Sequence, residues 1–150
     1  DPFQALCMSP DMLEANKHLV RQFFAAGPSG GDLRAADALL APDFAMHTPL
    51  PFTGPGIEAM NTVITTCRNA FHGLTVTIED MMAEGDKVTA RFVARGVHRG
   101  EFMGLPPTGK EIALTGIEIF RIRDGKIAEL WGEANLMGLM QQLGIIPAAG

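Results

Sequence analysis

Apolar side chains recur at helical spacing in the first half of the chain, which predicts three helices there. The predicted helices span residues 9–27, 31–44 and 56–71. The first begins with Ser9 and Pro10, residue types that favour a helix N-terminus. The apolar stripe of the third consists of Ile57, Met60, Ile64, Cys67 and Phe71. Residues 44–56 are rich in proline and glycine, so we expect an irregular passage with one short extended piece.

The second half of the chain alternates apolar and polar residues with the period of two that is typical of β-strands. The strands predicted from this alternation span residues 74–82, 87–100, 111–122 and 126–135, and a short helix follows at 136–143. Helices and strands in separate parts of the chain predict an α+β fold. The strand 111–122 is nearly apolar on both faces. We therefore expect helices to cover one face of the sheet and a second subunit to cover the other.

The composition is that of one globular domain with a real core, and it argues against several function classes. The 150 residues are 47% hydrophobic and carry a net charge of −5, which disfavours nucleic acid or anionic membrane partners. No apolar run is long enough to span a membrane. We expect a single domain over residues 1–150, with residues 1–9 as a flexible extension. Cys7 and Cys67 fit no metal or redox spacing, so we predict reduced, structural thiols, which suit a cytoplasmic protein.

Glu118 is the residue of the predicted sheet that fits its surroundings least. Alternation places it between Gly116 and Phe120 on an otherwise apolar strand face. A carboxylate there must be paired, hydrogen-bonded or protonated, and burial would raise its pKa toward the range of a general acid or base. The alternative is that Glu118 faces outward and pairs with Arg91 or Arg95. The pattern leaves both possibilities open.

Two histidines could act together with Glu118. His98 ends the apolar face of the strand 87–100, either as a structural group or as the partner of Glu118. His47 lies in the irregular passage and is a candidate pocket residue. Three ligands would be enough to hold a metal ion, but these three residues share no recognised ligand spacing, so we expect no metal site. The chain also lacks the phosphate-binding, dinucleotide and nucleophile-elbow fingerprints.

Two stretches of the chain resemble the SnoaL-like polyketide cyclases, also called ester cyclases. They are "NKHLVRQFFAAG…GDLRAADALLAPDFAMHTP" and "GVHRGEFMGLPPTGKEIALTGIEIFRIRDGKIAELW", the second followed by "LMGLMQQLG". The resemblance covers residues 14–146. It implies the cone of the nuclear-transport-factor-2-like proteins, an α+β barrel in which three N-terminal helices pack into a strongly curved antiparallel sheet of about four long strands, with a short C-terminal helix. It also implies a deep apolar pocket, a homodimer or higher oligomer through the back of the sheet, and aldol ring closure without metal or organic cofactor.

The same resemblance assigns positions around the pocket. His98 matches the histidine of the family's Gly-x-His-x-Gly stretch, and the catalytic aspartate of the characterised cyclases falls at Gly132. Glycine in the middle of a strand contributes no side chain, so we interpret Gly132 as a widened pocket wall without its carboxylate. Alternation directs the neighbouring Glu133 to the opposite face. The expected substrate-binding residues are His47, Met46, Phe92, Gly116, Phe120, Leu130, Gly132 and Asn135.

Three functions are compatible with these features. The first, which we favour, is a cofactor-free enzyme for aldol cyclisation, isomerisation or hydrolysis of an apolar carbonyl compound. Glu118 would be its base, and His98 would be the partner of Glu118 or an oxyanion donor. The second is a non-catalytic binding protein for a small apolar ligand, which the missing aspartate favours. The third is an oligomer-building protein with a vestigial cavity, for which a filled cavity would be decisive.

Overall fold

The computed structural model describes residues 9–48 and 56–148; Cys7 and residues 1–8 of the expected extension lie outside this range. Helical segments cluster near the N-terminus and strands follow, as predicted. In chain order the elements are α2 (Pro10–Phe24), the π-helical turn η1 (Ala25–Ser29), α3 (Leu33–Asp37), β1 (Leu40–His47), α4 (Gly56–Ala70), β2 (Phe71–Glu84), β3 (Lys87–His98), β4 (Glu111–Arg123), β5 (Lys126–Ala134) and α5 (Leu136–Gln142).

Side-chain caps explain where three of the helices begin. The Ser9 hydroxyl accepts a hydrogen bond from the Met12 N–H, and Asp32 accepts one from Ala35. Asn135 caps α5 in the same way, accepting from the Gly138 N–H at 2.9 Å. Each cap satisfies a backbone donor that the first turn of a helix leaves without a partner.

The predicted second helix extends about two turns too far, because the chain leaves the helix after Asp37 and continues as β1. Pro42 lies inside this strand. Proline is tolerated there because β1 is an edge strand, where one side of the backbone needs no partner.

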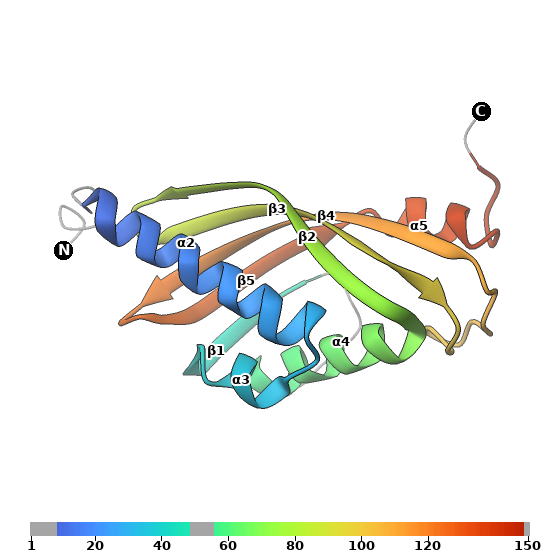
Figure 1. Ribbon diagram of the computed structural model, residues 1–150, viewed down its shortest axis with the longest axis horizontal. Coiled ribbons are helices and arrows are strands. Elements are labelled where there is room, and N and C mark those ends of the chain that lie inside the picture. Colours follow the sequence, from blue (N-terminus) through green and yellow to red (C-terminus); the bar gives the residue numbers. More distant parts are fainter. Residues whose placement is uncertain (1–8, 49–55, 149–150) are drawn as a thin grey trace.

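The sheet has five strands in the order β1-β5-β4-β3-β2. The neighbours from β2 to β5 pair antiparallel, as predicted. The strand that sequence patterns missed, β1, pairs with β5 in parallel at the other edge. Figure 1 shows the long, curved and unclosed sheet, with α2, α3 and α4 on its hollow side.

The core lies where α2 packs against the hollow side of the sheet. The rings of Phe23 and Phe24 lie 6.0 and 5.7 Å from that of Phe120 on β4, both edge-on. All three side chains are buried. Edge-to-face packing of this kind adds to the large apolar area that each ring buries.

The outer side of the sheet keeps apolar side chains in contact with solvent. Ile117 and Ile119 on β4 are 50% and 36% exposed.

Within the described residues, no helix is long and apolar enough to cross a bilayer.

Candidate functional site

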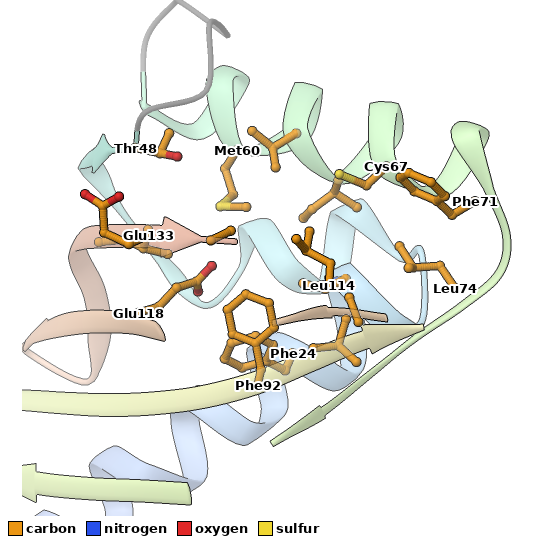
Figure 2. Close-up of a pocket in the computed structure, with 18 of the residues that line it drawn as sticks. Phe24, Thr48, Met60, Cys67, Phe71, Leu74, Phe92, Leu114, Glu118 and Glu133 are labelled. Atoms are coloured by element: carbon orange, nitrogen blue, oxygen red, sulfur yellow. The ribbon is translucent and has the colours of Figure 1, made fainter. Parts of the chain in front are cut away.

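A cavity of about 130 Å³ lies between α4 and the hollow side of the sheet (Figure 2). Its wall is almost entirely apolar, and the only acidic residues that line it, among those the structure describes, are Glu118 and Glu133. Side chains of α4, including Met60, Ile64 and Cys67, line it because the predicted helical stripe faces the sheet. Side chains do not fill this cavity, which argues against the third hypothesis, a vestigial cavity in an oligomer-building protein.

Glu118 extends from β4 into this cavity, which is one of the two orientations that the alternation pattern left open (Figure 2). Its side chain is half-buried, and the described residues offer its carboxyl group no hydrogen-bond or ion-pair partner. Burial raises the pKa of Glu118 to about 8. At pH 7 the neutral acid therefore outweighs the carboxylate by roughly ten to one.

The alternative orientation of Glu118 is excluded by the register of the sheet. Arg91, one of the two arginines considered as its partner, forms an ion pair with Asp80 at 2.6 Å on the exposed side. Glu118 instead has Ala90 of β3 and Gly132 of β5 as its direct neighbours across the sheet.

Gly132 provides space beside the Glu118 carboxyl group. A Cβ added at Gly132 would lie 3.5 Å from Glu118 Cγ and 3.7 Å from Glu118 Oε1, which is ordinary van der Waals contact. A side chain at this position would therefore reach Glu118 without a clash, so packing alone does not require glycine here.

Two further ionisable groups belong to the cavity wall. Burial, and secondarily the charge of Glu118, raises the pKa of the Cys67 thiol to about 11. The thiol stays protonated at neutral pH and is therefore a poor nucleophile. Glu133 is exposed at the rim, and its direct neighbour across the sheet is Ile117, so its side chain is directed to the outer side of the sheet, as alternation predicted.

Of the other predicted binding residues, Met46, Phe92, Leu130 and Gly132 line the cavity. They come from three different strands, β1, β3 and β5, and the alternation of each strand directs them to the hollow side of the sheet.

The predicted partnership of His98 with Glu118 is wrong. His98 lies eight residues along β3 from Ala90, the neighbour of Glu118, which places it about 26 Å away. His98 is fully buried, and its Nδ1 accepts a hydrogen bond from the Thr108 N–H at 3.2 Å. The pattern identified its strand face correctly but not its distance from Glu118 along the strand.

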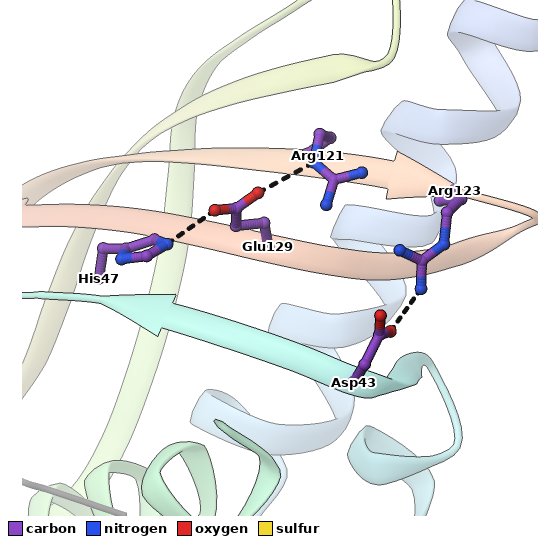
Figure 3. Close-up of polar contacts among 5 residues, drawn as sticks. All are labelled: Asp43, His47, Arg121, Arg123 and Glu129. Carbon is purple, nitrogen blue, oxygen red and sulfur yellow. Dashed lines mark hydrogen bonds and ion pairs between the residues drawn. The ribbon is translucent and has the colours of Figure 1, made fainter. Parts of the chain in front are cut away.

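The prediction of His47 as a pocket residue is also wrong. Because β1 is a strand, His47 points away from the neighbouring Met46, to the outer side of the sheet. There its Nε2 lies 2.7 Å from Glu129 Oε2 (Figure 3). Its ring also stacks on that of Trp131. Hydrogen bonds from His47 and Arg121 hold the pKa of Glu129 below its usual range. Asp43 and Arg123 form a further ion pair near this cluster.

Three more predicted binding residues lie outside the cavity wall. Gly116 lies beneath the Phe92 ring, where an added Cβ would be only 2.4 Å from Phe92 Cζ. Phe120 is fully buried in the core against α2, and Asn135 caps α5. Gly116 therefore supports a pocket residue without being one.

Phe102 is a cavity residue that the sequence patterns did not identify. It lies in the connection between β3 and β4, outside every predicted strand, yet it is 2% exposed. The available signal was an aromatic residue in a turn otherwise rich in glycine and proline.

Among the described residues, no group of three His, Cys, Asp or Glu side chains could hold a metal ion.

Known proteins resemble this chain in both sequence and structure. A family model described as SnoaL-like polyketide cyclase matches residues 18–143. Aklanonic acid methyl ester cyclase DnrD of Streptomyces peucetius is 32% identical over 107 residues, which are 70% of this chain and 71% of the relative. The structure of TsrD from Streptomyces laurentii has a TM-score of 0.81 at 33% identity and covers 93% of this chain and 100% of its own. Wild-type IdmH from Streptomyces antibioticus has a TM-score of 0.76 at 34% identity, with coverages of 86% and 98%.

Proposed function

The chain belongs to the SnoaL-like polyketide cyclase family, and from this premise we propose that it is a cofactor-free enzyme for acid/base chemistry on an uncharged, apolar carbonyl compound. Family membership supports a small-molecule ligand in the cavity. The observation that carries the finer proposal is the unpaired Glu118 carboxyl group in an otherwise apolar cavity, with its pKa raised to about 8.

Glu118 can serve both halves of a proton transfer near neutral pH. The ionised fraction removes a proton from the carbon next to a carbonyl, and the resulting enolate attacks a second carbonyl of the same molecule. The new carbon–carbon bond leaves an alkoxide, which takes the proton back from the Glu118 acid. Return of the proton to another carbon gives isomerisation instead. For hydrolysis, the carboxylate takes a proton from water as the water adds to an ester carbonyl, and the alcohol that leaves takes that proton from the Glu118 acid. An acid whose pKa lies near the working pH is suited to both roles.

The charges around the cavity favour an uncharged substrate. Glu118 and Glu133 are the charged residue types in its wall, and no Lys, Arg or His of the described residues lines it. Residues 49–55 contain no charged residue type. A free carboxylate in the substrate would meet no cation and would oppose ionisation of the Glu118 carboxyl group. The similarity to a cyclase named for a methyl ester, an uncharged group, supports this choice.

The test is turnover of Glu118→Gln against a panel of uncharged β-keto esters and diketones. Loss of proton transfer should lower kcat by about 10²- to 10⁴-fold. Glu133→Gln, at the exposed rim of the same cavity, is the matched control and should change kcat little. Turnover by Glu118→Gln equal to that of the wild-type protein would remove Glu118 from the mechanism.

The second candidate is a binding protein without turnover, which the absence of a carboxylate at Gly132 favours. In that case, the wild-type protein would bind members of the panel and return every one unchanged. Glu118→Gln would then alter affinity but leave no activity to lose.

We also propose that a second copy of the chain covers the outer side of the sheet, where Ile117 and Ile119 are exposed. Exposure of their apolar surface to water is unfavourable, and a symmetric contact between two copies would bury that surface on both copies.

A cytoplasmic location suits the free thiol of Cys67.

A further inference from the structure

Phe102 closes the end of the cavity that lies far from Glu118. Its ring lies 5.1 Å from that of Phe71, and both side chains line the cavity. Phe71 pairs with His98 of β3, whereas Glu118 pairs with Ala90, eight residues further back on the same strand. Figure 2 shows Phe71 and Glu118 at opposite ends of the lining. Because Glu118 is partly exposed and both phenylalanines are buried, the mouth lies near Glu118 and the closed end near Phe102.

A tight turn holds Phe102 in this position. The Phe102 and Leu105 N–H groups donate to each other's carbonyl oxygens at 3.0 and 2.9 Å. Between them, Met103 and Gly104 have φ values of 50° and 82°. Two successive positive φ values are typical of the tight hairpin turn, and they are unfavourable for a residue such as Met103. The turn directs Phe102 inward and leaves Met103 45% exposed.

Both ends of the connecting loop, residues 99–110, are fixed to the body of the protein. The Arg99 and Gly100 N–H groups both donate to the Ala70 carbonyl at 3.0 Å. At the other end, Nδ1 of the buried His98 accepts from the Thr108 N–H at 3.2 Å and lies 3.0 Å from the Thr108 hydroxyl. The Gly109 N–H donates to the His98 carbonyl at 2.8 Å. His98 is therefore the anchor of the loop that carries Phe102.

We propose that Phe102 determines the greatest ligand length that the pocket admits, and that His98 and Thr108 are positioning residues for its loop. The proposal rests on the proposed function, because it concerns the same pocket. A ligand whose carbonyl contacts Glu118 can extend toward Ile112, six residues away on β4 and about 20 Å along the strand, before the Phe102 ring blocks it.

The experiment measures how well methyl ketones with alkyl chains from heptyl to heptadecyl displace the neutral fluorescent probe N-phenyl-1-naphthylamine. In the wild-type protein, affinity should rise about fourfold with each methylene and then stop rising at a limiting length. Phe102→Ala should move that limit to longer chains, and Phe102→Trp to shorter ones. Phe120→Leu, at a buried phenylalanine outside the cavity wall, is the matched control and should keep the wild-type limit.

The positioning role is tested with His98→Asn, His98→Leu and Thr108→Val. Asparagine can place an acceptor where Nδ1 is, so His98→Asn should keep a sharp length limit. His98→Leu should blur the limit and accelerate amide hydrogen exchange in the loop by about tenfold, because the Thr108 N–H loses its partner. Thr108→Val should have a smaller effect in the same direction. A merely structural role for His98 would lower the melting temperature and leave the length limit unchanged.

An unchanged limit in folded Phe102→Ala would overturn the proposal, and Phe102→Leu serves the same purpose if the alanine variant does not fold. The proposed function is judged separately, by turnover of Glu118→Gln, so either can fail alone. If no ketone displaces the probe from the wild-type protein, the length limit is overturned, and turnover of the β-keto esters and diketones still decides the proposed function.

Discussion

Glu118 on β4 and Gly132 on β5 are direct neighbours across the sheet, and a Cβ added to Gly132 would touch Glu118 Cγ at 3.5 Å. The residue at position 132 therefore controls the surroundings of the carboxyl group that we propose as the acid/base. With glycine there, Glu118 has no neighbouring charge or hydrogen-bond donor at that position, and burial alone raises its pKa.

Gly132→Ala should change the stability of the protein, whereas Gly132→Asp should change its chemistry. The alanine variant should fold and gain about 0.5–1 kcal/mol, since a strand glycine has excess conformational entropy to lose. The aspartate variant places a second carboxyl group against Glu118, and like charges at that distance keep one group protonated to higher pH. The measurement is the pH dependence of kcat. An aspartate variant with the wild-type profile would show that position 132 does not reach Glu118.

Glu118 should make the folded protein less stable as pH rises. Its pKa is about 8 in the folded protein, against an ordinary value of 4.5, so the folded state holds more protons between these two pH values. Stability falls over that window and is level above it. Above pH 8, Glu118→Gln should be more stable than the wild type by about 1–3 kcal/mol, a range reduced because the side chain is only half-buried. Urea unfolding at pH 5 and pH 9 measures the difference, and an equal difference at both would contradict the raised pKa.

Alternation predicted the position of Glu118 and Gly132 because the pleat of a strand fixes which face each side chain occupies. It could not place His98 or His47. The face of His98 was readable, but its distance from Glu118 depends on the register between strands, which no local pattern carries. His47 failed because the prolines around β1 made it look irregular, and its partner β5 lies far away in the sequence. Sequence reasoning thus found five residues of the cavity wall and missed its closed end at Phe102.

Gly116→Ala should weaken the protein by displacing a pocket residue. The new methyl group would lie 2.4 Å from Phe92 Cζ and 3.0 Å from the Glu133 carbonyl oxygen, so the ring must move. We expect a loss of about 1–3 kcal/mol, typical of overpacking, together with weaker ligand binding. The control is Gly132→Ala on the neighbouring strand, because a Cβ added there makes only ordinary van der Waals contacts. Gly73→Ala would contact no atom within 4 Å, but the φ of 68° at that position would strain the backbone.

His47→Ala should leave the pocket unaffected, because the histidine lies on the outer side of the sheet against Glu129 and Trp131. We expect ketone affinity and kcat to stay within about twofold of the wild type, since contacts outside the pocket do not reach the ligand. Titration of binding and turnover checks this. A loss comparable to that of Glu118→Gln would return His47 to the site.

Ile117→Lys combined with Ile119→Lys should yield a monomer if the outer side of the sheet is a subunit interface. Burying two lysines without partners opposes association strongly. Analytical ultracentrifugation of the variant and the wild type measures the result. Met12→Lys, at an equally exposed methionine on α2, should keep the wild-type state. A wild-type protein that sediments as a monomer would contradict the interface.

The parallel pairing of β1 with β5 has a consequence for how the protein is made. Leu40 and Ile127 are neighbours in the sheet although more than eighty residues separate them in the chain. Contacts between such distant residues form late and slowly, since a long loop must close first. A chain emerging from the ribosome cannot complete this sheet until β5 has been synthesised. The wall that carries Gly132 is thus added last, and the half-made protein exposes the apolar lining that the finished one encloses.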